Sequence, residues 1–142
     1  MAESHSFDPT ILREYDIRGI VGDTLTRDDA YAVGRSFGTC VIEVGGDQVA
    51  LGFDGRLTSP DLAEAVVEGF VACGLLVKRI NIGPTPMLSF AIKHLETGSG
   101  LMVTGSHNPS DYNGFKMTRA GKPFFGDDIQ RLGEIAAAGA YA

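Results

Sequence analysis

Short apolar segments alternate with amphipathic helical segments along most of the chain, and this alternation limits the possible folds more than any other feature. A helix between two strands returns the chain to the same end of a sheet, so the strands on either side of it run parallel. The sequence therefore predicts an α/β fold, a three-layer αβα sandwich whose mixed, mostly parallel sheet is covered on both faces. The predicted elements, in chain order, are a helix from 26 to 41, a strand at 48–53, a helix at 59–73, a strand at 75–82, a helix at 86–95, a strand at 100–103, an edge strand at 115–117 and a helix at 127–138.

Two of the predicted helices begin with recognisable capping signals. Thr26 and Asp29 have the spacing of a capping box, in which each side chain bonds the backbone of the other residue. Ser59-Pro60-Asp61 supplies an N-cap serine, a proline at the first helical position and an acid in the first turn. Gly74 marks the end of that helix, and the polar residues 1–10 are predicted to be loose.

Length and charge narrow the class of protein and of ligand. The 142 residues, of which 44% are hydrophobic, suit one domain that spans 1–142. A net charge of −6 excludes a general nucleic-acid partner and an acidic membrane surface. No apolar run is long enough to cross a membrane and no signal-peptide layout opens the chain, which predicts a cytoplasmic protein. Basic residues nevertheless gather beside a few loops, which favours a small anionic ligand. They are Arg13, Arg18, Arg56, Lys116, Arg119 and Lys122.

The chain has two cysteines, Cys40 and Cys73. Each lies inside an apolar helical pattern, where cysteine behaves as a small hydrophobic residue. We therefore expect both to be core residues and neither a disulfide nor a metal site.

The segment Thr-Gly-Ser-His-Asn-Pro-Ser-Asp-Tyr-Asn-Gly at 104–114 directly follows the apolar run 101–103. A strand thus delivers Ser106 into a tight loop, which the glycine, proline and Asn-Gly residues keep non-helical. Gly105 lets the backbone come close to a ligand, and the amides around Ser106 can point at an anion.

Two further groups accompany this serine within the same stretch. His107 adds a titratable group and Lys116 a fixed positive charge. These are the groups that a serine needs in order to carry or receive a phosphoryl group. The alternative is a solvated turn in which Ser106 and Asn108 only bond the local backbone.

Residues 104–116 resemble the active-serine loop of the α-D-phosphohexomutases, in the branch that handles phosphomannose and phosphoglucose. Three other segments resemble motifs of that family in the same order. They are Arg-Glu-Tyr-Asp-Ile-Arg-Gly at 13–19, Gly-Phe-Asp-Gly-Arg at 52–56 and Gly-Pro-Thr-Pro at 83–86. The family more often has a charged residue at the place of Phe53. Together the motifs span residues 13–116, most of the chain.

The resemblance implies an intramolecular phosphotransferase that interconverts hexose 1-phosphate and hexose 6-phosphate, with mannose or glucose as the sugar. Ser106 would be the phosphoserine, which gives its phosphoryl group to the sugar and receives the other phosphate back from a bisphosphosugar. Lys116 would balance the charge of the phosphoryl group, and His107 would bond it or assist acid–base chemistry. Arg18 and Tyr15 would assist proton transfer or orient the phosphoryl oxygens. The residues implied to contact substrate or phosphate are Tyr15, Arg18, Asn108 and Lys116.

Each of these side chains has a structural alternative. Tyr15 could pack at a domain edge, and Asp16 could pair with Arg18 as a structural salt bridge. Lys116 could protect the edge of a sheet from unwanted pairing. Arg56, in the second motif, is expected to brace the loop more than it touches substrate.

The same resemblance implies a cofactor and partners. Magnesium would bridge the phosphate on Ser106 and a cluster of aspartates that these 142 residues lack. Hexose 1,6-bisphosphate would be activator and intermediate. The chain would correspond to the first of four domains, with small-molecule sugar phosphates and the later domains of the same polypeptide as its partners. Alone, it is expected to carry the serine but to have no mutase activity.

Other functions fit the sequence less well. A serine hydrolase needs Gly-x-Ser-x-Gly, and Thr104 and Asn108 stand where the glycines should be. A P-loop kinase or ATPase is excluded because Gly-x-x-x-x-Gly-Lys-Ser/Thr does not occur. A non-catalytic sugar-phosphate-binding or interaction module of the same fold remains the alternative, although a binding module has no need of the nucleophile Ser106. Gly105 favours the mannose/glucose branch, since the phosphoglucosamine branch typically has alanine there.

Overall fold

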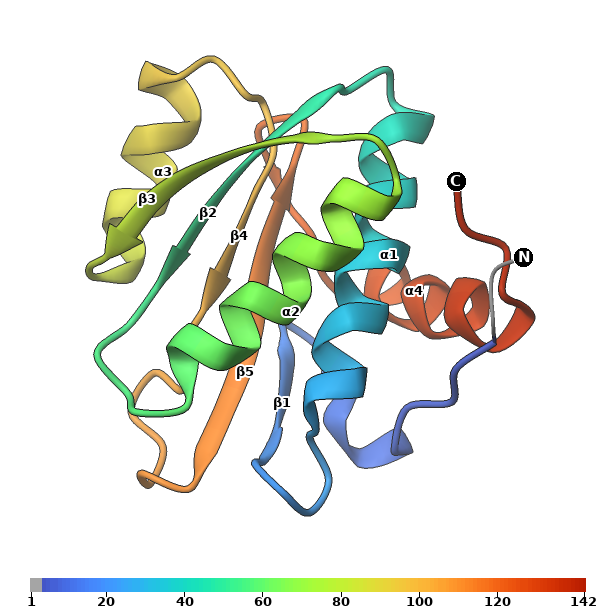
Figure 1. Cartoon of the computed structure of the whole chain (residues 1–142), viewed down its shortest axis with the longest axis vertical. Helices are drawn as coiled ribbons and strands as arrows, with labels where there is room; N and C mark the ends of the chain where they lie inside the picture. Colours follow the sequence, from blue (N-terminus) through green and yellow to red (C-terminus); the bar gives the residue numbers. More distant parts are fainter. Residues whose placement is uncertain (1–3) are drawn as a thin grey trace.

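Helices and strands alternate through the chain as predicted, and they build three layers (Figure 1). The computed structural model describes residues 4–142. Its elements are η1 (Pro9–Ile11), β1 (Ile17–Ile20), α1 (Arg27–Glu43), β2 (Gln48–Phe53), α2 (Ser59–Ala72), β3 (Leu76–Ile82), α3 (Thr85–His94), β4 (Gly100–Val103), β5 (Tyr112–Arg119), β6 (Lys122–Pro123) and α4 (Asp127–Ala138). None of the helices in this part of the chain is long and apolar enough to cross a membrane.

The sheet is mixed, and its strands follow the order β1-β5-β4-β2-β3, with β6 paired to β5. β2 pairs in parallel with β3 and β4, whereas β5 pairs antiparallel with β4, β1 and β6. Only β5 therefore runs against the other five strands. This confirms the prediction of an α/β fold with a mixed, mostly parallel sheet.

β5 lies inside the sheet, so the prediction of an edge strand at 115–117 is wrong. Its second edge is covered by β1, whose Ile17 pairs with Phe115. Gly114 permits this approach, because a Cβ on it would stand 2.1 Å from the Ile17 carbonyl oxygen. Asn113 and Gly114 are therefore strand residues and not a turn. The idea that Lys116 protects a sheet edge fails for the same reason.

Helices cover both faces of the sheet. Figure 1 shows α1 and α2 packed together on one face, where α4 also packs on α1, while α3 lies on the other. The α1–α2 contact is close enough to bring the two backbones together. A Cβ on Gly34 would stand 2.3 Å from the Val66 carbonyl oxygen, and one on Gly69 would stand 2.5 Å from that of Tyr31. On the opposite face a smaller core joins α3 to β2 and β4 through Ala50, Leu88, Ile92 and Met102.

The helix starts agree with the predictions in one case and differ in the other. Thr26 and Asp29 form both bonds of the predicted capping box at α1. At α2, however, Ser59 is already helical, and Thr58 occupies the cap position without a side-chain bond to the helix backbone. The Ser59 hydroxyl donates instead to Asp54. Gly74, with φ of +88°, follows the end of α2 as predicted.

The N-terminal segment is held to the domain. Phe7 is buried in the main core, and the His5 amide donates to the Ala136 carbonyl oxygen over 2.8 Å. The His5 ring also contacts Asp29, with 2.6 Å between Nε2 and Oδ1. The prediction that residues 1–10 are loose is therefore wrong for 4–10, because an aromatic side chain anchors them; residues 1–3 lie outside the described part.

Both cysteines are free and belong to the core, as predicted. Cys40 is fully buried, and Cys73 is partly buried against the same core. Burial raises the pKa of the Cys40 thiol to about 11. That thiol is therefore protonated and unreactive near neutral pH.

Candidate active site around Ser106

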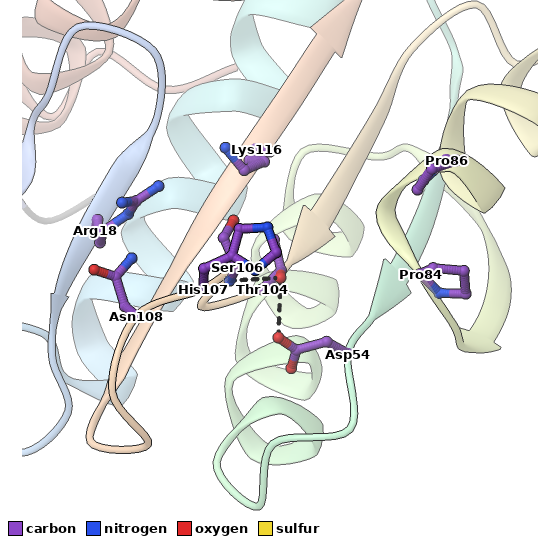
Figure 2. A pocket seen from close by; sticks show the side chains of 9 residues that line it. All are labelled: Arg18, Asp54, Pro84, Pro86, Thr104, Ser106, His107, Asn108 and Lys116. Carbon is purple, nitrogen blue, oxygen red and sulfur yellow. Dashed lines mark hydrogen bonds between the residues drawn. The ribbon is translucent and has the colours of Figure 1, made fainter.

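The loops that leave β2, β3 and β4 meet at one edge of the sheet, where the carboxyl ends of parallel strands are predicted to form a site. They enclose an open cavity of about 810 Å³. Figure 2 shows the side chains that line it, which come from every one of the motifs described above. They are Arg18, Asp54, Pro84, Pro86, Thr104, Ser106, His107, Asn108 and Lys116.

The cavity brings together all but one of the predicted site residues. Tyr15 is the exception: its side chain is 73% exposed and stacks on Phe125 with 6.2 Å between ring centroids. This pair lines a neighbouring apolar hollow that shares Lys116 with the main cavity. Tyr15 therefore stands at the rim, in agreement with its structural alternative, packing at an edge of the domain.

Ser106 has an unusual backbone for a residue with a side chain. Its φ is +53°, in the left-handed region that costs an ordinary residue about 1–3 kcal/mol. The Ser106 amide donates to the Thr104 hydroxyl over 3.0 Å. The surrounding contacts must therefore hold the serine in this conformation.

Asp54 supplies the first part of that support, because its carboxylate ties the loop after β2 to the loop after β4. It accepts from the Thr104 hydroxyl at 2.9 Å, the Gly105 amide at 3.0 Å and the Arg56 amide at 3.1 Å. The Ser59 hydroxyl also donates to it. Burial would raise the pKa of Asp54, but these hydrogen bonds to the ionised form outweigh burial and lower the pKa below the ordinary value of an aspartate. Asp54 is therefore a charged structural acceptor near neutral pH.

Arg56 supplies the second part from the interior of the loop. Its Nη2 donates to the carbonyl oxygens of Ser106 at 3.1 Å and Asn108 at 2.6 Å. Its Nη1 donates to those of Pro109 at 2.6 Å and Tyr112 at 3.2 Å. One planar guanidinium thus organises the whole turn, which confirms that Arg56 braces the loop.

Gly105 is required by this brace. A Cβ on Gly105 would stand 2.2 Å from Nε and 2.3 Å from Cζ of Arg56. The Arg56 side chain therefore makes a close approach to Gly105, and an approach of a ligand to this backbone stays a prediction.

The loop amides are also used within the protein. The amides of Gly105 and Ser106 bond Asp54 and Thr104, and that of Asn108 bonds the Gly105 carbonyl oxygen at 3.0 Å. The prediction that the amides around Ser106 point at an anion is therefore wrong for these three. Positive charge at the cavity comes from side chains.

Lys116 and Arg18 provide that charge from neighbouring strands. Arg18 on β1 is in register with Gly114 on β5, so Arg18 and Lys116 lie on the same face of the sheet. Both bond one oxygen of the buried Asp16: its Oδ2 is 2.6 Å from Arg18 Nη2 and 3.1 Å from Lys116 Nζ. The structural pairing of Asp16 with Arg18 is thus present, and it extends to Lys116. Both cations still line the cavity.

His107 and Asn108 complete the lining. His107 is exposed at the cavity. Asn108 lies on the Arg18 side in Figure 2, but its Nδ2 donates to the Gly105 carbonyl oxygen over 3.1 Å. Asn108 therefore makes the local bond of the alternative interpretation while it also faces the cavity.

Asn113 is a site residue that the sequence reasoning missed. It is fully buried, and its Nδ2 donates to the hydroxyls of Thr58 and Ser59 over 2.9 Å each. Through Ser59 it connects β5 to Asp54 and hence to the Ser106 loop. The sequence pattern places the Asn-Gly pair in the loop after β4, and the buried amide of Asn113 becomes evident only from the pairing of β1 with β5.

The described residues do not offer a magnesium site of their own. Among residues 4–142 no three His, Cys, Asp or Glu side chains are grouped so as to hold a metal ion. Asp54 is occupied by its hydrogen bonds, and Asp16 by two cations. The expected role of Ser106, to contribute through its phosphate, stays a prediction.

The chain matches the family model "Phosphoglucomutase/phosphomannomutase, alpha/beta/alpha domain I" over residues 9–141. It is 47% identical over 133 residues to a phosphomannomutase/phosphoglucomutase of Pseudomonas aeruginosa, covering 94% of this chain and 29% of that protein. It is 50% identical over 122 residues to a phosphoglucomutase of Neisseria meningitidis, covering 86% of this chain and 26% of that protein.

A solved structure shares the fold as well as the sequence. The crystal structure of a phosphoglucomutase/phosphomannomutase family protein from Burkholderia thailandensis superimposes with a TM-score of 0.90 at 40% identity. The match covers 95% of this chain and 31% of that one. The chain thus spans less than a third of the length of each of these three relatives.

Proposed function

We propose, since this chain belongs to the phosphoglucomutase/phosphomannomutase family, that Ser106 carries the phosphoryl group in the interconversion of hexose 1-phosphate and hexose 6-phosphate. The sugar is mannose or glucose. One observation carries the proposal: a serine held in a left-handed backbone stands in the same cavity as Lys116 and Arg18. Because the relatives are more than three times longer, the complete reaction is proposed for a polypeptide of their length.

The chemistry is two phosphoryl transfers in opposite directions. In the first, a sugar hydroxyl attacks the phosphate on Ser106; a new oxygen–phosphorus bond forms, and the bond to the Ser106 oxygen breaks. The resulting hexose 1,6-bisphosphate then returns its other phosphate to Ser106. The attacking hydroxyl loses a proton and the leaving oxygen regains one, and the exposed His107 is a titratable group at the cavity that would assist these proton transfers.

The side chains at the cavity suit a transfer of this kind. A phosphoserine carries a charge of about −1.5 to −2 near neutral pH, and a loose transition state spreads that charge over the phosphoryl oxygens. Lys116 and Arg18 can donate to those oxygens as the bond breaks. The frame of Asp54 and Arg56 keeps the serine in place for both transfers, so little reorganisation is needed.

Magnesium and hexose 1,6-bisphosphate belong to the proposal as cofactor and activator. When bound, magnesium would supply charge neutralisation at the phosphate on Ser106. No suitable group of side chains occurs among residues 4–142. The protein ligands of the magnesium ion would therefore come from a part of the polypeptide outside these residues. No step proposed for this chain depends on it.

A chimera tests the proposed function. Residues 1–142 replace the matching segment of the Pseudomonas aeruginosa relative, and intact mass is measured after treatment with glucose 1,6-bisphosphate. We expect one added phosphoryl group, lost in Ser106→Ala and retained in Ser110→Ala, which changes an exposed serine of the same loop. Equal labelling of the chimera and its Ser106→Ala variant would refute the assignment.

The same chimera distinguishes the alternative, a non-catalytic sugar-phosphate-binding module. Such a module would bind glucose 1-phosphate in a titration but would neither take up phosphate nor form glucose 6-phosphate in a coupled assay. Uptake of phosphate on Ser106 together with turnover would exclude it.

A further inference from the structure

Asp16 is the buried partner of the two cations that face Ser106. Its side chain is 6% exposed, compared with 23% for Arg18 and 34% for Lys116. Arg18 and Lys116 line the cavity, whereas Asp16 does not. The carboxylate therefore lies behind the cations, on the side away from the space in which a phosphate would sit.

Asp16 is also held independently of its ion pairs. The Arg13 amide donates to the Asp16 carbonyl oxygen over 3.0 Å, and Ile17, the next residue, begins β1. The backbone from which the carboxyl group extends is thus fixed without the ion pairs. A change from carboxylate to amide at this position alters charge more than shape.

The charges explain why this arrangement matters for a phosphoryl group. Two positive charges and one negative charge leave one net positive charge for an anion at the cavity. A phosphate that contacts Lys116 or Arg18 shares these cations with the carboxylate of Asp16, whose negative charge offsets part of their attraction for the phosphate. Binding that is equally tight before and during transfer does not accelerate the transfer. A group that weakens the hold on the resting phosphoserine therefore favours its release.

We infer that Asp16 is a positioning residue that also acts as a built-in competitor for the phosphoryl group. It holds Lys116 and Arg18 beside the cavity, and it limits how strongly they bind a phosphate there. The inference rests on the proposed function, because it assigns Asp16 to the same phosphoryl site. A purely structural role makes the opposite prediction: loss of the carboxylate would loosen the cations and weaken phosphate binding.

The test measures inorganic phosphate binding by the 142-residue chain in solution, followed through backbone amide NMR signals of residues 104–116 at constant ionic strength. We expect Asp16→Asn to bind phosphate about three- to tenfold more tightly than the wild type, because a like charge close to the anion is removed. Asp23→Asn is the matched control, since it removes the same charge from an exposed residue that forms no ion pair among residues 4–142. It should bind like the wild type.

Two further measurements keep the inference testable if Asp16→Asn unfolds. In the wild type, the carboxyl carbon signal of Asp16 should change along the same phosphate titration curve as the Ser106 amide. In Lys116→Met, the phosphate-induced change at Asp16 should shrink, because the shared donor is gone.

The outcomes separate this inference from the proposed function. The role of Asp16 alone is overturned if the wild type binds phosphate and Asp16→Asn binds it with equal or lower affinity. It is also overturned if the carboxyl carbon signal of Asp16 does not change on addition of phosphate. Absence of phosphate binding near Ser106 in the wild type and in the variant overturns this inference together with the anion site of the proposed function.

Discussion

The brace between Arg56 and Gly105 makes a strong quantitative prediction. Arg56→Ala removes one charged donor group from four carbonyl oxygens. A hydrogen bond to a charged group contributes about 1.5–3 kcal/mol, so full loss would cost about 6–12 kcal/mol. The acceptors lie in a partly exposed loop, where water can replace most of the lost bonds. We therefore expect the free energy of unfolding to fall by about 3 kcal/mol.

Gly105→Ala should cost a similar amount through the same contact. The added methyl would stand 2.2 Å from Arg56 Nε, whereas ordinary van der Waals contacts begin near 3.4 Å. The guanidinium must move by about 1 Å, which breaks the bonds that it makes to the loop. We therefore expect a loss of about 3 kcal/mol for this variant as well.

The double variant distinguishes this explanation from two independent effects. The three atoms nearest to a Cβ on Gly105 all belong to Arg56, so the methyl group has room once the arginine is gone. Arg56→Ala combined with Gly105→Ala should cost about 3–4 kcal/mol instead of about 6, a coupling of about 2 kcal/mol or more.

Urea unfolding of the 142-residue chain, followed by circular dichroism, measures all three variants. Gly55→Ala is the matched control in the neighbouring loop, where the nearest atom is 3.7 Å from the added methyl, and it should change stability by about 0.5 kcal/mol or less. Additive losses in the double variant would refute the proposed contact. A Gly105→Ala variant as stable as the wild type would refute it more directly.

Three further predictions concern the charges of Lys116 and Asp54 and the activity of the 142-residue chain without further domains. In the chimera, Lys116→Met should lower mutase turnover at least about tenfold in a coupled assay, since it removes a cation from the transferring phosphoryl group. The melting temperature of this variant should stay close to that of the unsubstituted chimera. Because the pKa of Asp54 is lowered on folding, its carboxylate contributes stability at pH values above the ordinary pKa of aspartate, and this stability is lost as the pH falls through the folded pKa. The stability difference between wild type and Asp54→Asn in urea unfolding should therefore shrink in acid; a constant difference would contradict this. The 142-residue chain alone should convert no glucose 1-phosphate to glucose 6-phosphate in the coupled assay, because its described residues lack a metal-ligand cluster.

Elements with local boundaries could be predicted from the sequence. β2 and β4 have the predicted ends, because each is an apolar run bounded by polar or glycine residues. α4 begins at Asp127 and ends at Ala138 as predicted, with acidic residues in its first turn and Gly139 after its last. These signals act over a few residues, so no knowledge of distant contacts was needed.

Elements defined by distant partners could not be predicted in the same way. β1 is short, and its pairing with β5 joins residues 17–20 to residues 112–115. Without that pairing, β5 looks like an edge strand and Asn113-Gly114 looks like a turn. Ser59 shows the same limit, because Ser-Pro-Asp is a good local cap signal. Its hydroxyl bonds Asp54 instead, since a charged acceptor in a partly buried site competes better than the helix end.

The sequence predicted which side chains lie at the site, but not which groups are used to hold the loop and which are left to face the cavity. The motifs identified Ser106, Lys116 and Arg18, and the structure places all three at one cavity. Local reasoning assigned the loop amides to an anion, but Asp54 and Thr104 accept from the amides of Gly105 and Ser106. In the proposed reaction, the side-chain charges of Arg18 on β1 and Lys116 on β5 would therefore hold the phosphate.

The loop amides and the charged side chains at the cavity differ in how freely they can change their partners. Amides committed to Asp54 are fixed as long as the loop is folded, whereas ammonium and guanidinium groups on long side chains can turn between a carboxylate and a phosphate. A phosphoserine that must be formed and released in each cycle benefits from partners that can exchange. In the proposed cycle, the rigid frame would keep the Ser106 oxygen in one place, and the exchangeable partners of Asp16 would let the phosphate leave it. Rigidity and exchange thus reside on different residues, which is why Arg56 variants should affect stability first and Asp16 variants phosphate affinity first.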